Sequence, residues 1–359
     1  MCKRILASQT NTEDGVPFYK IGTIGSTPDA YISKELFDDY KVKYSYPHKG
    51  EVMITCAGTV GKCVVYDGED AYFQDSNIVW IDNPTQNISN GFLFHLLSKV
   101  DWRKLNSTTI IRIYNDDLRN LKMSYPQKEE QQKISHLLSL LDERITTQNK
   151  IIEDLKKLKS AIIERHYNQT EKQTVFIADL GEPFNVGNLS KDDLSETGNP
   201  CIIYGELFTT YGETISQIES HTNKKEGMTL SKKGDLLFPT STTVDAISLI
   251  APSVINVDGV ILGGDMFGIH ISTNFNAQYL SYYFNHIAKR QLAKFAKGST
   301  IIHLHYTDIE KARLLLPSLE EQNKMANCLI SLDEKIRVEK SYLQLLDKQK
   351  AYLLRQMFI

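Results

Sequence analysis

Two long stretches of the chain carry a helical pattern of apolar residues. Over residues 126–168, and again over residues 317–359, apolar side chains recur at alternating intervals of four and three. This spacing gathers them on one face of a helix, and its persistence over about four heptads is typical of a coiled coil. A proline opens each stretch and glutamates follow it, as is common in the first turn of a helix. The pattern predicts two long helices, over 128–166 and 319–358.

The two stretches are copies of one another. A shift of 191 residues lays the first on the second without a gap, including a Glu-Glu-Gln motif at 129–131 and 320–322. Both copies interrupt the apolar seam at the same places, with Gln148 and Glu339 and then with Lys159 and Lys350. Matched interruptions favour two helices that pair with each other rather than two helices buried in separate cores.

The seam of the predicted helix pair is defined by the apolar residues that fill the repeating positions. These are Leu138, Leu141, Ile145, Leu155, Leu329, Leu332, Ile336 and Leu346. Additional leucines and isoleucines lie beside the seam and widen the apolar stripe. They include Leu137, Leu140, Ile151 and Leu158. We therefore expect one helix face to contact something besides the partner helix.

The sequence before each long helix predicts a globular region, and the two regions follow a similar plan. In the first, residues 51–54, 63–66 and 77–81 are rich in β-branched and aromatic residues and predict strands. A helix is expected over 91–105. In the second region the corresponding helix is expected over 277–297, about one turn longer.

Short motifs align the two regions. Lys-Gly-Glu at 49–51 matches Lys-Gly-Asp at 233–235, and Asp265 can be laid on Asp75. Farther on, Thr-Ile-Ile at 109–111 matches 300–302. The second region also begins with strand-like residues at Val175-Phe176-Ile177 that have no counterpart in the first. We therefore expect the first region to lack an opening strand.

These patterns predict a mixed α/β (α+β) protein with a pseudo-two-fold internal repeat. Two similar globular domains are joined by two long helices that form an antiparallel coiled coil within one chain. The expected domains are a first globular domain with a short N-terminus, the first long helix, a second globular domain and the second long helix. Their boundaries are 1–125, 126–168, 169–316 and 317–359.

Composition adds little that is specific to function. The net charge is −3, so any nucleic-acid footprint must be a local basic patch. The five cysteines are odd in number and scattered, which suits a reducing compartment rather than a disulfide framework or a zinc site. No apolar run is long enough to span a membrane, and the N-terminus does not have the pattern of a signal peptide. We expect a cytoplasmic protein.

Catalytic patterns are weak throughout. The stretch 58–63 has a glycine and a lysine placed as in a phosphate loop, but cysteines stand where the first glycine and the final serine or threonine belong, so a turn between strands is the better interpretation. Asn83-Pro84 and Asn199-Pro200 lack the second proline and the aromatic residue expected of an adenine methyltransferase. His303 and His305 have no evident partner ligands. We expect no catalytic residues and no metal site in this chain.

The repeat itself is the strongest functional signal. Two similar domains related by a pseudo-two-fold axis match the local two-fold symmetry of duplex DNA. A helix of roughly 38 residues is roughly 57 Å long, on the order of 17 base pairs. This scale fits two DNA half-sites separated by an unread gap.

The motifs together resemble the specificity (S) subunit of type I restriction–modification systems. The resemblance rests on the doubled helix motifs at 126–145 and 317–336, the Lys-Gly-Asp/Glu motifs at 49–51 and 233–235, Phe73-Gln74-Asp75-Ser76-Asn77, and Gly298-Ser299-Thr300. It implies two target recognition domains, each reading one part of a split DNA sequence, and a helix pair that sets the spacer and docks two methyltransferase (M) subunits. It also implies that the chain is no enzyme and binds no cofactor itself. S-adenosylmethionine would then lie in the M subunits, and ATP and Mg in the restriction (R) subunits of the full complex.

Residues that contact DNA are expected among polar side chains in loops between strands, because base edges are read by donors and acceptors. The candidates in the first domain are Lys20, Thr59, Lys62, Gln74, Ser76, Asn77 and Arg112. Those in the second domain are Tyr204, Ser241, Thr242, Thr243, Lys297, Ser299 and His303. Two alternatives remain open: a coiled-coil adaptor whose tandem domains bind protein or glycan, and an enzyme that acts alone.

Overall fold

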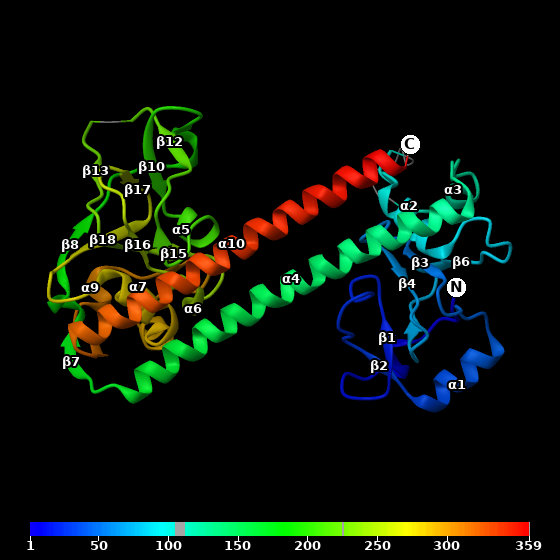
Figure 1. The fold of residues 1–359 in the computed structure, drawn as a ribbon. Helices are drawn as coiled ribbons and strands as arrows, with labels where there is room; N and C mark the ends of the chain where they lie inside the picture. The colour runs from blue at the N-terminus through cyan, green and yellow to red at the C-terminus, as the bar shows by residue number, and fades with distance from the viewer. Residues whose placement is uncertain (105–111, 225, 359) are drawn as a thin grey trace. The chain divides into compact units, whose positions relative to one another are not determined.

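The protein divides into two compact units. The first is built from two separate parts of the chain, and the second from one continuous part. The computed structural model describes residues 1–104, 112–224 and 226–358. Unit 1 consists of residues 1–149 and 341–359, and unit 2 consists of residues 150–340 (Figure 1). Residues 109–111, which were predicted to match 300–302, lie outside the described residues.

Two long helices, α4 (Lys128–Gln169) and α10 (Leu319–Met357), run from one unit into the other. The other elements of unit 1 are β1 (Val16–Tyr19), β2 (Tyr31–Ile32), α1 (Lys34–Lys43), β3 (Val52–Thr55), β4 (Cys63–Val65), β5 (Tyr72–Phe73), β6 (Ile78–Ile81), α2 (Asn90–Lys99) and α3 (Asn115–Arg119). A short 3-10 turn, η1 (Ala7–Gln9), precedes them.

Unit 2 is richer in strands. Its strands are β7 (Gln173–Phe176), β8 (Gly181–Asn185), β9 (Leu194–Ser195), β10 (Asn199–Ile203), β11 (Thr214–Ile215), β12 (Ser220–Thr222), β13 (Thr229–Leu230), β14 (Asp235–Pro239), β15 (Ser241–Thr242), β16 (Ser253–Ile255), β17 (Ile261–Gly263), β18 (Met266–Ile271), β19 (Ile302–His303) and β20 (Arg313–Leu316). Its helices are α5 (Glu206–Thr209), α6 (Ala246–Leu249), α7 (Ala277–His286), α8 (Lys289–Leu292) and α9 (Tyr306–Ile309), with 3-10 turns η2 (Ile177–Asp179), η3 (Lys191–Asp193) and η4 (Ala293–Phe295).

The sheets of the two units share a common plan. In unit 1, β3 lies between β4 and β6 in an antiparallel sheet, and β1 pairs antiparallel with β2 and parallel with β5. In unit 2, β14 lies in the same way between β16 and β18, and β10 pairs antiparallel with β12 and parallel with β17. The predicted duplication of the globular regions is therefore visible in the strand pairing.

Matching glycines mark equivalent close approaches of the backbone in the two units. Gly15 has a φ of +119°, and a Cβ added there would meet the carbonyl oxygen of Ile32 at 2.4 Å. Gly198 has a φ of +133°, and an added Cβ would meet the carbonyl oxygen of Thr222 at 2.6 Å. Only glycine fits either position, so sequence pattern and backbone geometry agree here.

One predicted alignment is wrong by two residues. The Cys56 N–H donates to the carbonyl of Asn77 at 2.7 Å, and the Thr240 N–H donates to the carbonyl of Asp265 at 2.8 Å. Asp265 is therefore the counterpart of Asn77 and not of Asp75. The error arose because successive strand residues alternate between faces, so a shift of two residues preserves the apolar pattern.

The helices predicted within the two globular regions are shorter than expected. The helix expected over 91–105 ends at Lys99, and Val100 is already extended. The helix expected over 277–297 stops at His286 and is followed by the separate short helix α8. The break falls where the N–H groups of Ile287 and Ala288 both donate to the carbonyl of Tyr283. Apolar spacing alone does not reveal such a break.

The two long helices pack against each other in an antiparallel sense within each unit. In unit 1, Asp142 bonds with Lys350 and Arg144 bonds with the Tyr342 hydroxyl. In unit 2, the Lys159 ammonium lies 2.6 Å from Asp333, and His166 lies 3.3 Å from Glu321. Along these contacts the residue numbers increase on α4 while those of the partners on α10 decrease, which confirms the antiparallel prediction.

Of the predicted seam residues, Leu138, Leu141, Leu329, Ile336 and Leu346 are buried, and Ile145, Leu155 and Leu332 are half-buried.

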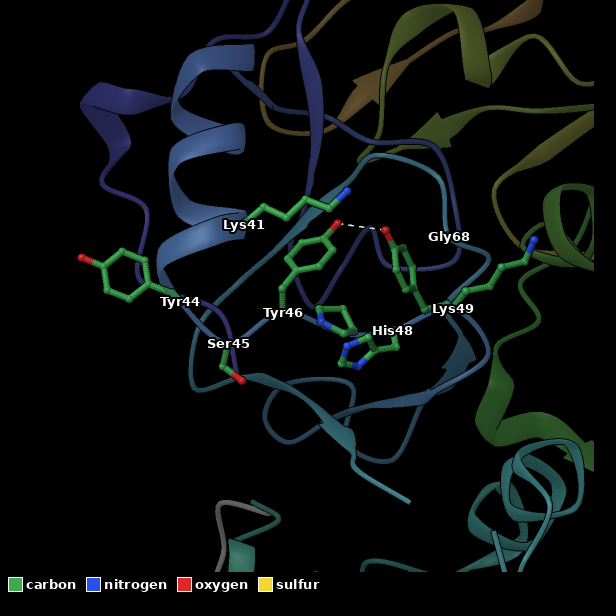
Figure 2. A pocket seen from close by; sticks show the side chains of 9 residues that line it. Lys41, Tyr44, Ser45, Tyr46, His48, Lys49 and Gly68 are labelled. Atoms are coloured by element: carbon green, nitrogen blue, oxygen red, sulfur yellow. Dashed lines mark hydrogen bonds between the residues drawn. The ribbon is translucent and has the colours of Figure 1, made fainter. Parts of the chain in front are cut away.

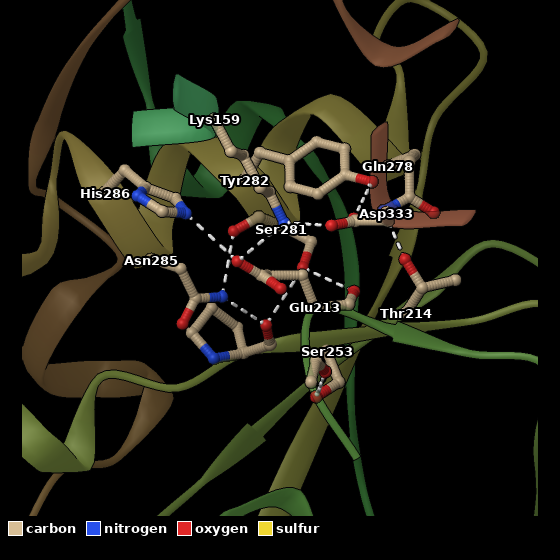
Figure 3. Close-up of polar contacts among 12 residues, drawn as sticks. Lys159, Glu213, Thr214, Ser253, Gln278, Ser281, Tyr282, Asn285, His286 and Asp333 are labelled. Atoms are coloured by element: carbon tan, nitrogen blue, oxygen red, sulfur yellow. Dashed lines mark hydrogen bonds and ion pairs between the residues drawn. The ribbon is translucent and has the colours of Figure 1, made fainter. Parts of the chain in front are cut away.

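The lysines that interrupt the seam lie in polar contacts. Lys159 is 6% exposed and bonds both Asp333 and Glu213, while the Tyr282 hydroxyl donates to Asp333 at 2.7 Å (Figure 3). Burial alone would raise the pKa of Glu213, but its hydrogen bond with His286 and the charge of Lys159 outweigh burial and lower that pKa to about 2. This buried network joins α4, α7 and α10 within unit 2.

The glutamine of each Glu-Glu-Gln motif fastens a long helix to the helix of its own unit. Gln131 is 1% exposed, accepts from the Ser89 N–H at 2.7 Å, and donates to the carbonyl of Pro126 at 2.9 Å. Gln322 accepts from the Asn276 N–H at 3.0 Å and donates to the carbonyl of Pro317 at 2.9 Å. Ser89 and Asn276 are the N-caps of α2 and α7, so the repeated motif has one structural role in both units.

Candidate nucleic-acid interface

Most of the predicted DNA-contact residues of unit 2 lie together around one small sheet. Strand β15 pairs antiparallel with β19, so that Ser241 faces His303 and Thr242 faces Ile302. Lys297 forms a further antiparallel bridge with His303. Thr243 follows β15 directly, and Ser299 lies in the loop between Lys297 and His303. Six of the seven candidates are therefore brought together.

The polar groups of this cluster are held by nearby carboxylates. The Ser241 hydroxyl donates to Asp265 at 2.8 Å, which leaves its lone pairs available to a donor. The Lys297 ammonium lies 2.5 Å from Asp308, and this hydrogen bond lowers the pKa of Asp308. The His303 ring stacks on His305 with centroids 6.2 Å apart. Ser241 itself is buried, but the hydroxyl of Thr243, the imidazole of His303 and the ammonium of Lys297 are exposed. Exposed groups of these kinds suit the base edges and phosphates of DNA.

Tyr204 is the exception in unit 2. It lies between β10 and α5, and its ring is next to Gly264. The structure does not place it in the β15–β19 group.

Three basic residues near this group were missed by the sequence reasoning. Lys289 and Arg290 lie on α8, and Lys294 lies on η4. These elements contact α6, which in turn contacts β15 and β19. The signal was present in the sequence, because no Asp or Glu occurs between Asp265 and Asp308. The stretch between these two aspartates therefore carries basic side chains and no acidic ones, despite the slightly acidic net charge.

In unit 1, four of the predicted residues line a single hollow of about 360 Å³. They are Lys20, Gln74, Ser76 and Asn77. Arg112 adjoins them, since its guanidinium donates to the carbonyl of Ser76 at 3.5 Å. Ser76 is a non-glycine residue with a φ of +55°, a conformation that turns the chain sharply just before β6. The structure brings these five candidates together.

The remaining two candidates of unit 1 belong to the turn between β3 and β4. Thr59 is exposed, and its carbonyl accepts from the Thr55 hydroxyl. The Lys62 ammonium donates to the carbonyl of Ile24 at 2.5 Å, so its charge is already engaged within the unit. This geometry favours turn stabilisation over DNA contact for Lys62.

The two groups occupy equivalent places in the two units. The Ile113 N–H donates to the carbonyl of Cys56, and the Leu304 N–H donates to the carbonyl of Thr240, both at 2.9 Å. Arg112 and His303 immediately precede these donors and are thus counterparts. Asn77 and Asp265 are counterparts by the strand register given above. The same backbone frame therefore presents different side chains in each unit.

The family of the chain follows from its sequence as a whole. A sequence profile of the type I restriction modification DNA specificity domain matches residues 1–157 and 169–348. The chain belongs to this family. It is a DNA specificity subunit of a type I restriction–modification system, the non-catalytic member of the enzyme complex, and it binds no cofactor itself.

Individual relatives agree with this assignment. A putative type I restriction enzyme specificity subunit of Haemophilus influenzae is 51% identical over 155 residues, which cover 43% of this chain and 40% of that protein. The putative MjaX specificity subunit of Methanocaldococcus jannaschii is 22% identical over 96% of this chain and 87% of its own length. The crystal structure of the S subunit from M. genitalium matches all of this chain and 92% of that one, with a TM-score of 0.63 at 15% identity. A structure from a study of type I complex assembly matches 97% of this chain and 92% of that one, with a TM-score of 0.56 at 16% identity. At these identities the structural matches show a shared fold.

A second hollow in the specificity subunit was also missed from the sequence. It measures about 520 Å³ and is lined by Lys41, residues 44–49, Tyr66 and Gly68 (Figure 2). The hydroxyls of Tyr46 and Tyr66 bond each other at 2.9 Å, and the Lys41 ammonium lies 3.0 Å from Asp70. The polar groups of Lys41, Tyr46 and Tyr66 thus have partners within unit 1.

Within the described residues, no group of three or more His, Cys, Asp or Glu side chains could hold a metal ion. No helix in the described part of the chain is long and apolar enough to cross a membrane.

Proposed function

We propose that each unit of this specificity subunit reads one half of a split DNA sequence. The observation that carries the proposal is the duplicated frame in which Arg112 and Asn77 of unit 1 correspond to His303 and Asp265 of unit 2. Equivalent frames with different side chains would recognise two different half-sites. Arginine suits the acceptors of guanine, while serine and histidine can bond several bases.

The two long helices would set the distance between the half-sites. Helix α4 contains 42 residues and α10 contains 39. At about 1.5 Å per residue each is roughly 60 Å long, on the order of 17 base pairs. The buried Lys159 network and the Gln131 and Gln322 contacts support this role, because they fasten the helices to the folded part of each unit.

We further infer that the exposed apolar faces of the long helices dock two methyltransferase subunits. On α4 the exposed residues are Leu137, Leu140, Ile151 and Leu158. On α10 they are Leu319, Ile330, Val338, Leu345 and Tyr352. Each set falls on one side of its helix. An exposed apolar face of this kind is typical of a surface that binds another protein. Restriction subunits would join this assembly to form the full complex, and the complex would act in the cytoplasm, where the cell's DNA lies.

The half-site assignment can be tested by mapping methylated sites. The chain is co-expressed with its methyltransferase subunits, and methylated adenines are located by sequencing. Ser241→Ala with His303→Ala should alter one half-site only, and Asn77→Ala with Arg112→Ala should alter the other. Lys191→Ala, at an exposed position of η3 that belongs to neither group, serves as a surface control. A change in both half-sites from either variant pair would refute the assignment of one half-site to each unit.

The alternative of an adaptor that binds protein or glycan had the acidic net charge as its best support. The acid-free stretch between Asp265 and Asp308 weakens that support, because its basic residues adjoin the β15–β19 group. DNA recognition therefore remains the function that the structure favours.

A further inference from the structure

Unit 1 has an open sheet edge where unit 2 has a paired one. In unit 2, β18 pairs with β14 on one side and with β8 on the other. In unit 1, the counterpart β6 pairs with β3, and among the described residues no strand pairs with its outer edge. An open edge presents unpaired N–H and C=O groups that can bind another strand.

The outward-facing groups of β6 can be identified from the register. The bond from the Cys56 N–H to the Asn77 carbonyl makes Asn77, Val79 and Ile81 face β3. The N–H and C=O of Trp80 therefore face the open edge. The equivalent groups of Gly268 face β8, in agreement with the bond from the Ser272 N–H to the Leu180 carbonyl farther along the same edge.

Side-chain exposure also marks the difference between the two units. Ile269 is 0% exposed in unit 2, whereas its counterpart Ile81 is half-buried. A second strand of unit 2, β20, pairs with β7 and buries Leu316 completely. Its counterpart in unit 1, Tyr125, is 47% exposed and lies in a segment without assigned strand structure. In unit 2 both buried residues pair with the segment 173–185: Ile269 lies opposite Pro183, and Leu316 lies opposite Gln173.

We propose that unit 1 binds an extended strand–turn–strand segment, like residues 173–185, along the open edge of β6. The first strand would pair with residues 122–125 and the second with the outer edge of β6. Unit 2 shows that this frame accepts such a segment, and backbone hydrogen bonds would provide the affinity, as in other cases of strand addition.

The residue opposite Trp80 sets a chemical requirement on this partner. In unit 2, Phe184 lies opposite Gly268, and a Cβ on that glycine would meet the Phe184 ring at 2.0 Å. Trp80 stands at the equivalent position of unit 1, where its large side chain is half-buried against the core. The partner segment should therefore carry a small β-branched residue where unit 2 has Phe184.

The probe is a synthetic peptide with the sequence of residues 173–185 and the substitution Phe184→Thr, titrated onto the full chain. Trp80 and Trp102 are the only tryptophans, and both belong to unit 1, so their fluorescence reports binding. We expect saturable binding and slower hydrogen exchange at the Trp80 amide. The Phe184→Thr peptide should also bind more tightly than the parent peptide, which keeps Phe184.

Two N-methylated forms of the Phe184→Thr peptide make the matched comparison. N-methylation at position 184 removes the inward-facing N–H and should weaken binding about tenfold or more, because it also places a methyl group in the ladder. N-methylation at position 185 alters an outward-facing N–H and should change affinity less than about twofold. Equal affinity of the two N-methylated peptides, unchanged exchange at Trp80, or no binding by the Phe184→Thr peptide would overturn the proposal.

Discussion

At the scale of single residues, the repeated motifs are explained by buried polar contacts rather than by chemistry on a substrate. The glutamine of Glu-Glu-Gln bonds the N-cap residue of a helix in each unit. The lysine that interrupts each seam likewise pairs with the aspartate that directly follows a seam leucine on the other long helix. The sequence showed that these residues repeat, but it could not show that Gln131 and Lys159 are almost fully buried. Repetition alone does not distinguish a structural polar residue from a functional one.

Gln131→Ala should destabilise unit 1 substantially. The substitution leaves the Ser89 N–H and the carbonyls of Asn87 and Pro126 without their side-chain partner, at a cost of about 2 kcal/mol or more. Urea unfolding followed by tryptophan fluorescence measures this directly, since both tryptophans lie in unit 1. The neighbouring exposed residue gives the control: Gln132→Ala should shift the transition little, and an equal shift for both variants would mean that burial of Gln131 is not what matters.

Glu213 should make unit 2 sensitive to acid. Its pKa falls from 4.5 to about 2 in the folded chain, so the unfolded state takes up a proton first as the pH drops. The stabilisation is complete above pH 4.5 and is lost as the pH falls towards 2. Glu213→Gln should therefore cost about 2 kcal/mol at neutral pH and progressively less below the unfolded pKa, as measured by circular dichroism of urea unfolding. A difference between the two proteins that does not change with pH would contradict this account.

At the scale of elements, the pattern predicted the long helices and the strands β3, β4 and β6 well, and the two-residue strands poorly. The predicted helices 128–166 and 319–358 agree closely with α4 and α10, because many turns repeat the same signal. Helix α1 and two-residue strands such as β9, β13 and β15 went unnoticed, since long-range pairing rather than local pattern defines such strands. The clustering of Ser241 with His303 depends on that pairing and could not be read from the sequence.

The seam can be tested by crosslinking within unit 1. Leu141 and Leu346 are 7% and 4% exposed, and the contacts of Asp142 with Lys350 and of Arg144 with Tyr342 place both leucines on facing sides of α4 and α10. Leu141→Cys with Leu346→Cys, in a Cys328→Ser background, should form an intramolecular crosslink under mild oxidation. The pair Leu137→Cys with Leu346→Cys should crosslink much less, because Leu137 faces solvent. Crosslinks found only between chains would disprove the intramolecular helix pair.

At the scale of the whole molecule, duplication was the most informative property of the sequence. Net charge pointed away from DNA, whereas the order of two globular regions and two helices pointed towards a specificity subunit. Overall charge is a poor guide here because the acid-free stretch between Asp265 and Asp308 concentrates basic residues locally. The side chains within each frame were only partly predictable, since a shift of two residues left the strand pattern unchanged.

The length of the helix pair should determine the spacer between the two half-sites. Inserting one heptad after Ile145 and another after Ile336 preserves the apolar seam, because the two copies share one register. Each helix grows by roughly 10 Å, on the order of three base pairs, and the gain in the spacer is smaller where the helices are inclined to the duplex.

Methylation mapping in cells that carry this variant with its methyltransferase subunits should show unchanged half-sites and a longer spacer. A matched variant with the heptad inserted in α4 alone disrupts the pairing of the seam and should abolish methylation. Altered half-sites at an unchanged spacer would place sequence recognition on the helices, because the insertion touches neither the Arg112 group nor the His303 group.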